Sequence, residues 1–464
     1  MRSECNTLPG RGTGRALVLG LGRSGKAAAR LLVAQGYRVS AFDEAPREER
    51  MEAVRELEAL GVRVIHGSLE QSPAEVPDLA VVSPGIPADR PGLLWLRTAG
   101  VPVLGEMELG IRFLHRPYAA VTGTNGKTTT ATLLAHILEQ TGRHAVLAGN
   151  VGNPLCGMLD SFGRDSIGVL EVSSYQLETV EKFHPCVAVI TNITPDHLAR
   201  HKTMEQYVGL KARILENMDP GDTAVLNHDD ARVRDLSGRT RAQIRYFSVL
   251  RPVAGTFAKS GNLWIGPGAR PKRLMARDEI PLPGQHNVEN VLAAVCAAMA
   301  LGVDPGAARS AVSSFPGVPH RQEVVAVLDG VTYINDSKAT NSESAMMALD
   351  SYESPVVVIL GGSPKKAEYG PLMAMVRAKG AYPVLVGETA QELEESAQSA
   401  GIPEIQRAAS MEEAVAMARR KAVPGGIVLL SPACPSFDMF RDYEHRGDVF
   451  REIVHGYESR EKEN

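Results

Sequence analysis

A loop around Lys127, rich in glycine, threonine and asparagine, is the strongest candidate for chemistry in this chain. It reads Thr122-Gly-Thr-Asn-Gly-Lys-Thr-Thr129 and lies between an apolar strand predicted at 118–121 and a helix. Backbone amides and the lysine of such a loop bind β- and γ-phosphates, and the Thr128 hydroxyl would ligate Mg²⁺. The usual pattern has glycine where this chain has Val121, so the loop is a tighter variant. An ordinary strand–turn–helix would leave the Thr/Asn/Gly run unexplained, so the loop predicts ATP binding.

Three side chains further along the chain are candidate ligands for the Mg²⁺ that a γ-phosphate site needs. Glu171 follows the strand predicted at 167–170, where it would otherwise be a helix-capping glutamate. His197 follows the strand at 187–190, in Asn192-Ile-Thr-Pro-Asp-His197, and its position suits a solvated loop residue equally well. Lys211 lies in an amphipathic stretch, 204–217, and by position alone we expect it on the solvent-exposed face.

A second glycine loop, Gly20-Leu-Gly-Arg-Ser-Gly25, lies between a strand at 15–19 and a helix at 26–35. Asp43 ends the next strand, close to the spacing expected of a residue that contacts a ribose. The agreement of strand, helix and acidic residue favours nucleotide binding over an empty turn. The nucleotide need not be NAD.

The last third of the chain is rich in lysines and hydrogen-bond donors, which suit carboxylates or phosphates. These residues lie in Asn335-Asp-Ser-Lys-Ala-Thr-Asn341, Gly361-Gly-Ser-Pro-Lys-Lys366 and Ser431-Pro-Ala-Cys-Pro-Ser-Phe-Asp438. The same residue types are common in turns. His320-Arg321 lies at the preceding domain junction, where an arginine would reach across a cleft.

The elements that must position these residues are alternating apolar strands and amphipathic helices, typical of α/β folds. We predict an α/β protein of about three domains: a Rossmann-like domain at 1–106, a central P-loop ATPase-like domain with a mainly parallel sheet at 107–318, and a C-terminal Rossmann-like α/β domain at 319–464. Within them we expect a buried helix at 288–301 and an antiparallel sheet edge within 241–279. The polar clusters all follow carboxyl ends of strands, where ligands of open parallel sheets bind.

Composition excludes several other classes of protein. The 464 residues are 44% hydrophobic and 22% charged, with a net charge of −4, so neither disorder nor a nucleic-acid-binding surface is indicated. The five cysteines are scattered, which argues against a disulfide framework or a zinc cluster. The polar N-terminus lacks a secretory signal and no uncharged apolar run is long enough to span a membrane. We therefore expect a cytoplasmic protein that binds neither nucleic acid nor a membrane. We also expect a monomer, although these features do not fix the oligomeric state.

Taken together, the motifs resemble those of the Mur ligases, in order and over nearly the whole chain. The resemblance is carried by the Lys127 loop and by Gly149-Asn-Val-Gly152, Leu170-Glu-Val-Ser-Ser-Tyr-Gln-Leu-Glu178, Asn192–His197, Pro283-Gly-Gln-His-Asn-Val-Glu-Asn290, His320-Arg321, Asn335–Asn341 and Gly361-Gly362. The form of the 170–178 segment, the segment Leu430–Asp438 and the Rossmann-like opening resemble the branch that adds D-glutamate. The Asp-Asn-Pro-Arg motif of the diamino-acid-adding branch does not occur in the sequence.

The resemblance implies an ATP-dependent amide ligase of peptidoglycan synthesis, which acts in cell wall biogenesis, cell shape and cell division. Its substrates would be UDP-N-acetylmuramoyl-L-alanine and D-glutamate. The implied contacts with the UDP end are Gly22, Arg23, Ser24, Asp43, Ser83, Pro84 and Gly85, and those with the muramoyl part are Asn150, Ser173 and Tyr175. Residues implied at D-glutamate are Thr340, Lys365, Ser436, Phe437 and Tyr443.

The resemblance also implies how ATP and two Mg²⁺ ions are bound. The implied ATP contacts are Gly123, Thr124, Asn125, Gly126, Lys127, Thr128, Thr129, Asp196, Asn287, Asn290, Arg321 and Asp336, with His286 beside them. The implied metal ligands are Thr128, Glu171, His197 and Lys211, the last as a carbamylated lysine. The implied catalytic residues are Lys127, His197, Lys211 and Lys338. Ala199 departs from the family, which often has Asp there.

Without the resemblance, spacing alone stops at an ATP-dependent ligase or phosphotransferase that acts on a nucleotide-linked acid. Three alternatives stay open at this point. The first is another Mur-type ligase with a different incoming amino acid. The second is an NAD-dependent oxidoreductase built on the Gly20 loop and Asp43. The third is a nucleotide-driven switch without synthetic chemistry. The oxidoreductase alternative leaves the Lys127 loop and the whole third domain without a task.

Overall fold

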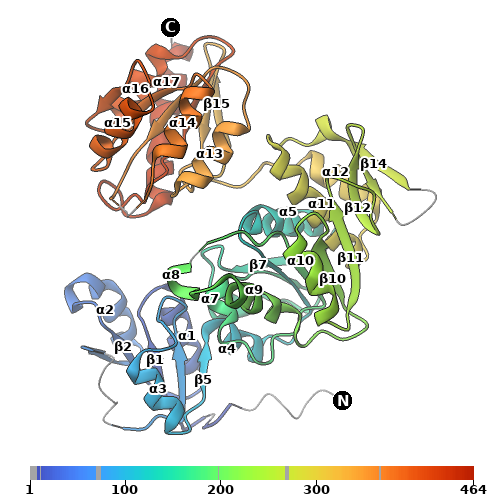
Figure 1. The fold of residues 1–464 in the computed structure, drawn as a ribbon. Helices are drawn as coiled ribbons and strands as arrows, with labels where there is room; N and C mark the ends of the chain where they lie inside the picture. The colour runs from blue at the N-terminus through green and yellow to red at the C-terminus, as the bar shows by residue number, and fades with distance from the viewer. Residues whose placement is uncertain are drawn as a thin grey trace. The chain divides into compact units, whose positions relative to one another are not determined.

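The computed structural model describes residues 8–10, 12–68, 75–196, 198–266, 271–364 and 367–463, with side chains throughout except at 198, 199 and 458–463. The chain forms two compact units (Figure 1). One comprises Met1–Ile280 and Val288–Phe315, and the other comprises Pro281–Asn287 and Pro316–Asn464. Among the described helices, none combines the length and the apolar composition that crossing a membrane requires.

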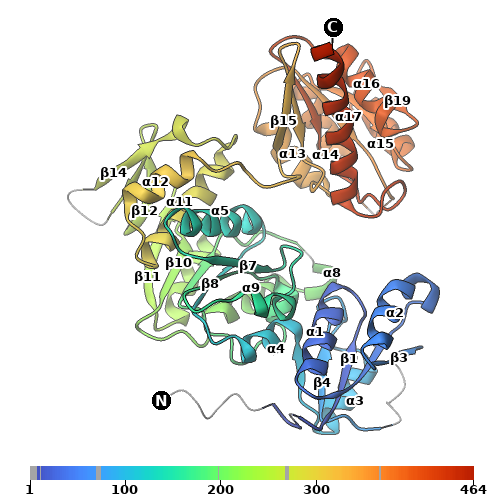
Figure 2. The same cartoon turned by 180° about the vertical axis from the view of Figure 1, so that it is seen from behind.

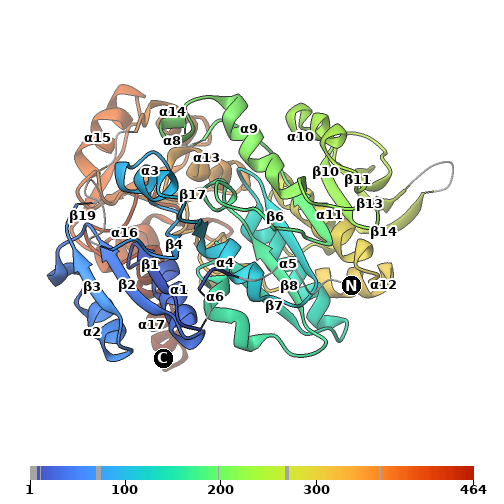
Figure 3. The same cartoon turned by 90° about the horizontal axis from the view of Figure 1, so that it is seen from below.

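The first sheet of the larger unit is parallel, with the strand order β3-β2-β1-β4-β5 (Figure 3). Its strands are β1 (Arg15–Leu19), β2 (Arg38–Asp43), β3 (Arg63–His66), β4 (Leu79–Val82) and β5 (Val103–Gly105). The helices of this part are α1 (Arg23–Ala34), α2 (Met51–Ala59), α3 (Pro91–Thr98) and α4 (Glu106–Phe113). Apolar residues of α1 and α2 pack on one face of the sheet, and Leu93 and Leu96 of α3 pack on the other (Figures 1 and 2).

The central sheet of the same unit has the order β14-β13-β12-β11-β10-β9-β6-β8-β7. Its strands are β6 (Tyr118–Thr122), β7 (Ala145–Gly149), β8 (Ile167–Glu171), β9 (Val187–Ile190), β10 (Thr223–Asn227), β11 (Gln243–Ser248), β12 (Gly255–Lys259), β13 (Asn262–Ile265) and β14 (Lys272–Ala276). Strands β6 to β11 pair in parallel, whereas β12, β13 and β14 form an antiparallel edge. The antiparallel edge predicted within 241–279 is therefore confirmed.

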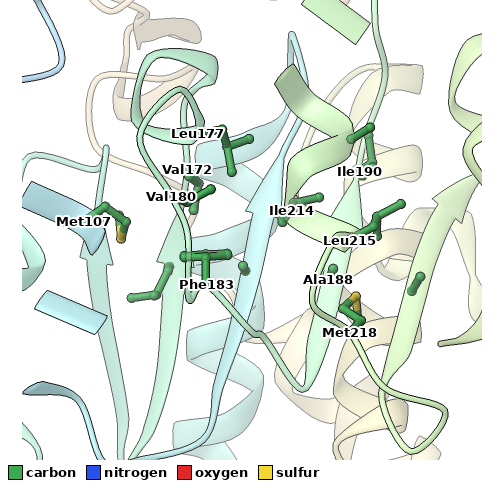
Figure 4. Packing of buried hydrophobic residues seen from close by; sticks show 14 of the residues in the cluster. Met107, Val172, Leu177, Val180, Phe183, Ala188, Ile190, Ile214, Leu215 and Met218 are labelled. Atoms are coloured by element: carbon green, nitrogen blue, oxygen red, sulfur yellow. The ribbon is translucent and has the colours of Figure 1, made fainter. Parts of the chain in front are cut away.

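Helices of the central part bury a large apolar core against this sheet. They are α5 (Lys127–Gln140), α6 (Leu155–Met158), α7 (Ser174–Leu177), α8 (Leu198–His201), α9 (Met204–Ala212), α10 (Ala231–Asp235), α11 (Gln285–Ala300) and α12 (Pro305–Ser313). In one core, Phe183, Val180 and Leu177 lie close to the sheet, with Ile214 and Met218 beside them (Figure 4). Helix α11 carries a run of fully buried residues from Val291 to Ala298, which confirms the buried helix predicted at 288–301.

The smaller unit contains a third sheet with the order β15-β16-β20-β17-β18-β19. Its strands are β15 (Glu323–Leu328), β16 (Val331–Asn335), β17 (Val356–Leu360), β18 (Tyr382–Val386), β19 (Gln406–Ala408) and β20 (Ile427–Leu430), and only the pair β15–β16 is antiparallel among them. Its helices are α13 (Ser342–Asp350), α14 (Gly370–Ala378), α15 (Ala390–Ser399), α16 (Met411–Lys421) and α17 (Tyr443–Glu463). One face packs on α13, α14 and α15, and the other on α16 and α17.

Short 3-10 helices complete the larger unit, at η1 (Arg47–Arg50), η2 (Leu159–Ser161), η3 (Arg213–Leu215), η4 (Leu236–Arg239) and η5 (Arg277–Glu279). The predicted α/β fold with three mostly parallel sheets is confirmed. The domain boundaries at 106 and 318 stay a prediction.

Candidate active site

The Lys127 loop lies at the switch point of the central sheet. Strand β6 has β8 on one side and β9 on the other, so the segments that leave these three strands meet at one edge. The loop turns sharply at Gly123, with φ +149°, and at Gly126, with φ +81°, which precedes the first residue of α5. A Cβ on Gly126 would stand 2.2 Å from Asn290 Oδ1. This close approach places Asn290 against the loop that the sequence predicts for ATP.

Residues after β9 hold the loop in shape. The Asn125 amide donates to Asn192 Oδ1 at 2.9 Å, and the Thr191 hydroxyl donates to the Asn125 carbonyl at 2.6 Å. The Thr124 amide donates to the Asn192 carbonyl at 2.8 Å. The loop is therefore fixed before any phosphate binds. The Lys127 ammonium donates to the Thr124 carbonyl at 2.7 Å, while Thr128 and Thr129, in the first turn of α5, are buried.

Lys211 is buried beneath this loop, with only 1% of its surface exposed. Its ammonium donates to the Gly123 carbonyl at 2.6 Å, across 88 residues of sequence, and lies 4.7 Å from the centre of the Tyr207 ring. Burial lowers the pKa of Lys211 well below its usual value and the nearby Lys127 lowers it further, with Asp196 and Glu171 acting in the opposite direction. The expectation of a solvent-exposed lysine was wrong, because the helix turns this face toward the loop.

Glu171, the last residue of β8, is also buried, at 1% exposure. Its Oε1 accepts from Asn150 Nδ2 at 2.7 Å, but within the described part of the chain its Oε2 has no hydrogen-bond partner, and neither has the buried hydroxyl of Thr122. Buried carboxylate oxygens are costly unless they are paired or bind a cation. Glu171 pairs with Val121, the residue before the Lys127 loop, and its carboxylate oxygen fits Mg²⁺, which prefers oxygen ligands. His197, the remaining predicted ligand, lies outside the described residues.

A second group of possible ligands is less suited to a metal. His184, Asp219 and Asp222 have ligand atoms within 4.8 Å of one another. They lie at the amino ends of β9 and β10, on the edge of the sheet opposite the Lys127 loop. Asp219 already pairs with Arg241 at 3.3 Å, and Asp222 accepts from His184 at 2.7 Å. The two carboxylates are therefore already engaged with protein side chains.

In the first sheet, the predicted loop lies at the switch between β1 and β4. Gly20 has φ +91°, and the Ser83 hydroxyl after β4 donates to its carbonyl at 3.3 Å. The turn Ser83-Pro84-Gly85 is closed by the Ile86 amide, which donates to Ser83 O at 3.0 Å. The structure thus brings the two predicted segments together.

Asp43 serves the same loop from β2. Its carboxylate accepts from the Leu21 amide at 2.6 Å and from the Ala45 amide at 2.8 Å. Both oxygens are therefore occupied by backbone donors, and the side chain orients the strand ends. Gly22 precedes α1, and Arg23 and Ser24 form its first turn.

A small cavity connects this loop edge with the central part of the same unit. It is lined by Ser83 and Pro84 on one side and by Tyr175 and Gln176 on the other. Arg23 approaches Gly152, where an added Cβ would lie 3.1 Å from its Nη1. Ser173 is the N-cap of α7, with its hydroxyl accepting from the Gln176 amide, so its side chain is engaged locally. Of the residues predicted for a UDP-linked substrate, Ser83, Pro84 and Tyr175 therefore line one cavity of the larger unit.

In the smaller unit, Asp336 lies at the carboxyl end of β16 and is buried. Its oxygens accept from the Ser431 hydroxyl at 2.9 Å and from the Gln322 amide at 3.2 Å, and burial raises its pKa to about 7. The neighbouring Arg321 lowers that pKa, and its own Nε is buried without a hydrogen-bond partner. Lys338 has its ammonium 5.3 Å from the centre of the Tyr443 ring.

The residues predicted for D-glutamate lie on the loops after β16 and β20 and at the start of α17. The Thr340 amide donates to the Lys338 carbonyl, Ser436 is buried, and Phe437 is 74% exposed. The fifth residue predicted for D-glutamate, Lys365, lies outside the described residues. Asn287, which is predicted for ATP, belongs to the smaller unit, and its side-chain amide donates to Pro283 O at 2.7 Å.

Sequence patterns missed three residues that the structure places in these sites. Thr191 and Tyr207 are near the Lys127 loop, where the Tyr207 hydroxyl lies 3.2 Å from Thr124 Oγ1. Arg446 is 2% exposed within the loops of the smaller unit. Thr191 directly precedes the Asn192–His197 segment, so its position beside that motif was the available signal. Tyr207 and Arg446 lie on α9 and α17, outside the motifs, and only tertiary contacts bring them to these loops.

Comparison with known proteins matches the whole arrangement. Three family models cover the chain: the Mur ligase MurD-like N-terminal domain at 14–105, the Mur ligase middle domain at 121–298 and the Mur ligase glutamate ligase domain at 320–434. A relative from Pelotomaculum thermopropionicum is 43% identical over 95% of this chain and 97% of its own length. The chain belongs to the Mur ligase family. This membership gives no support to the oxidoreductase alternative. The three matched ranges include the strands of the three sheets apart from the start of β6.

Another relative and two solved structures are also similar to this chain, the relative in sequence and the structures in fold. A relative from Koribacter versatilis is 41% identical over 97% of this chain and 98% of its own length, and both relatives are named UDP-N-acetylmuramoylalanine–D-glutamate ligase. Among solved structures, a UDP-N-acetylmuramate–alanine ligase from Thermotoga maritima has a TM-score of 0.60 at 20% identity, covering 96% of this chain and 99% of its own. MurF from Acinetobacter baumannii has a TM-score of 0.62 at 17% identity, covering 95% and 93%. These structures share the fold.

Proposed function

We propose that this protein joins D-glutamate to UDP-N-acetylmuramoyl-L-alanine by an amide bond, with ATP converted to ADP and phosphate, in peptidoglycan precursor synthesis. The observation that carries the proposal is the near full-length similarity to ligases named for this reaction. The buried Lys127 loop, with Glu171 and Lys211 beside it, supports the ATP-dependent step.

ATP binds to the loop from Gly123 to Thr129, with Asp196 and Asn290 beside it. The amides of a loop that is already held by Thr191 and Asn192 need little reorganisation to bind phosphate oxygens, and such preorganised donors are the most effective kind. Asn287, Arg321 and Asp336 are the proposed ATP contacts of the smaller unit.

Thr128, Glu171, His197 and Lys211 would hold two Mg²⁺ ions. When bound, Mg²⁺ offsets the charge on the phosphates and so eases attack on the γ-phosphorus. The unpartnered Glu171 Oε2 supports this assignment.

A buried lysine becomes a metal ligand only if it carries a negative group. We propose that Lys211 is carbamylated: its neutral amine attacks CO₂, forms an N–C bond and releases one proton. Burial favours the neutral, nucleophilic amine, because a charged ammonium is costly inside the protein. With ¹³C-bicarbonate, NMR should show a carbamate carbon in the wild type that is absent from Lys211→Arg. Its presence in both proteins would contradict the assignment.

The reaction proceeds in two steps. First, an oxygen of the alanyl carboxylate attacks the γ-phosphorus, the bond to the bridging oxygen breaks, and ADP leaves. Lys127 stabilises the charge that develops on the transferred phosphoryl group. The amine of D-glutamate then attacks the carbonyl carbon of the acyl phosphate, a tetrahedral intermediate forms, and phosphate leaves with loss of a proton from the nitrogen. Orienting the amine lowers the entropic part of the barrier.

The two substrates are assigned to separate groups of residues. The UDP end binds at Gly22–Ser24, Asp43 and Ser83–Gly85, and the muramoyl part binds at Asn150, Ser173 and Tyr175. D-glutamate binds at Thr340, Lys365, Ser436, Phe437 and Tyr443, and Lys338 assists the reacting groups. Asp43 acts by orienting the loop amides, since both of its oxygens accept from the backbone. We propose that the enzyme works as a cytoplasmic monomer, and light scattering coupled to size exclusion tests the monomer.

The test measures phosphate release with ATP, Mg²⁺ and UDP-N-acetylmuramoyl-L-alanine, comparing D-glutamate with L-glutamate, L-lysine and meso-diaminopimelate. We expect release with D-glutamate and a stoichiometric amide product. Release with another amino acid would retain the mechanism but refute the D-glutamate assignment. ATP hydrolysis indifferent to every amino acid would favour a nucleotide-driven switch.

Lys127→Ala should abolish ADP release, because the loop loses the only cation that its own segment carries. Lys182→Ala is the matched control, since Lys182 is an exposed surface lysine of the same unit. Normal turnover in Lys127→Ala would refute the ATP site.

A further inference from the structure

Arg446 is a buried arginine at the start of α17, and among the described residues its guanidinium donates to uncharged oxygens alone. Nε donates to the Ser337 hydroxyl at 2.9 Å and Nη2 donates to the Ser337 carbonyl at 2.8 Å. Nη1 donates to the carbonyls of Cys434 and Pro435, at 3.0 and 3.2 Å. Burial lowers the pKa of Arg446 to about 10, so the group remains charged at neutral pH. Asp438 acts on this pKa in the opposite direction, but no carboxylate of the described residues accepts a hydrogen bond from the guanidinium. A buried charge without such a partner is costly, and apolar packing would stabilise the fold better.

The oxygens that Arg446 binds belong to two separate loops of the smaller unit. Ser337 follows β16 and directly precedes Lys338, while Cys434 and Pro435 follow β20 and directly precede Ser436. Strands β16 and β20 are neighbours in the sheet, so both loops leave the same edge. The planar guanidinium, with donors in a fixed fork, sets the separation of the two loops.

The loop after β17 joins the same cluster. The Ser363 amide donates to the Pro435 carbonyl at 2.9 Å, so this oxygen serves both the arginine and the third loop. A Cβ on Gly362 would stand 2.1 Å from that carbonyl and 3.1 Å from Arg446 Nη1. Three loops that follow adjacent strands therefore converge on one side chain.

We infer that Arg446 is a positioning residue, which holds the loops carrying Lys338 and Ser436 in the arrangement that receives the incoming amino acid. The inference rests on the proposed function for the identity of that amino acid, but the clamp itself does not. A lysine keeps the charge and reaches one loop, yet its single ammonium cannot reproduce the fork. Methionine keeps much of the side-chain volume and removes every donor.

The kinetic test compares Arg446→Lys and Arg446→Met with the wild type. We expect the KM for D-glutamate to rise about tenfold in Arg446→Lys and further in Arg446→Met, as expected when hydrogen bonds to a charged group are lost. The KM for UDP-N-acetylmuramoyl-L-alanine, whose proposed contacts lie in the other unit, should stay within about twofold. A KM for D-glutamate that is unchanged in both variants would overturn the inference.

Phe450→Leu is the control for simple destabilisation, since Phe450 is fully buried in the same helix and belongs to an apolar core formed with residues of β16, β17 and α16, without a polar group that could bind the loops. This variant should lower the melting temperature without changing the KM for D-glutamate. If it raises that KM as much as Arg446→Lys does, Arg446 contributes stability alone and the inference fails.

Hydrogen–deuterium exchange tests the clamp without any substrate. The amides of Ala433 and Ser363, which donate to the carbonyls of Ala339 and Pro435, report on the three loops. They should exchange about tenfold faster in Arg446→Lys and remain protected in Phe450→Leu. If Arg446→Lys exchanges faster but the wild type shows no D-glutamate-dependent turnover, the clamp is retained and only the proposed function is refuted. Unchanged exchange in Arg446→Lys would refute the clamp.

Discussion

Replacing Glu171 by glutamine should stabilise the protein while it removes the activity. Glu171 is 1% exposed, and among the described residues its carboxylate has a hydrogen-bond partner at Oε1 alone, the side-chain amide of Asn150 at 2.7 Å. The substitution keeps the shape of the side chain and that hydrogen bond, and it removes a buried charge. An unpaired buried group costs about 1–3 kcal/mol, and a charged one costs more. We therefore expect the free energy of unfolding to rise by about 1–2 kcal/mol.

Glu108→Gln is the matched control, because Glu108 is equally buried but fully paired. Its Oε1 accepts from Arg112 Nε at 3.0 Å, and its Oε2 accepts from the Glu181 amide at 2.9 Å and the Lys182 amide at 3.1 Å. A glutamine must turn an NH₂ group toward some of these donors. The loss of a buried paired charge costs about 3–5 kcal/mol, so the same chemical change has the opposite sign here.

Thermal unfolding with and without Mg²⁺ and a non-hydrolysable ATP analogue measures both effects. At about 2–4 °C per kcal/mol, Glu171→Gln should melt several degrees higher and Glu108→Gln about ten degrees lower than the wild type. At about 100 times their dissociation constant, the ligands should stabilise the wild type by about 2.7 kcal/mol, and Glu171→Gln by much less. The assignment of Glu171 as an unsatisfied metal ligand would be refuted by either of two results. One is a Glu171→Gln protein that melts lower than the wild type without ligands. The other is a Glu171→Gln protein that Mg²⁺ and the ATP analogue stabilise as much as they stabilise the wild type.

Three further predictions follow from single contacts. Burial raises the pKa of Glu106 from 4.5 to about 7, so between these values the folded chain holds a proton that the unfolded chain has released. The stability that this group contributes therefore falls as the pH rises across that window. Glu106→Gln does not titrate, so its melting temperature should rise relative to that of the wild type from pH 5 to 7, and a constant difference would contradict this. Gly126 has φ +81°, and an added Cβ would lie 2.2 Å from Asn290 Oδ1, so Gly126→Ala should destabilise the protein and abolish ATP-dependent phosphate release. The control is Gly61→Ala, because Gly61 has φ +79° but nothing within 4 Å of an added Cβ. It should cost only about 1–2 kcal/mol of backbone strain in the same melts and leave turnover intact. Phe437→Ala, at a residue 74% exposed, should leave the melting temperature unchanged and raise the KM for D-glutamate, and an unchanged KM would remove Phe437 from the site.

Local patterns in the sequence determined much of the fold. Strands such as Ile427–Leu430 are continuous apolar runs because parallel strands are buried on both faces, so they can be predicted without tertiary information. The Lys127 loop was predictable for a similar reason, since glycines at fixed offsets between a strand and a helix require a particular backbone path. His197 and Lys365 lie outside the described residues, so their assigned roles stay predictions.

The tertiary structure decided what lies beside each loop. Lys211 follows a helical pattern that predicts exposure, yet it is buried because it lies beneath the Gly123 carbonyl. Asp43 matches the spacing of a ribose contact, but its oxygens are already bound to backbone amides.

Arg446 is the clearest case of a residue whose place was decided by the tertiary structure and not by a sequence pattern. It has no motif around it, and its partners Ser337 and Cys434 are 109 and 12 residues away in the chain. Periodicity and glycine placement act over a few residues, so the sequence by itself determines elements and turns. Which side chains share a site depends on the order of strands in each sheet, and that order is set by the packing of whole elements rather than by any one segment.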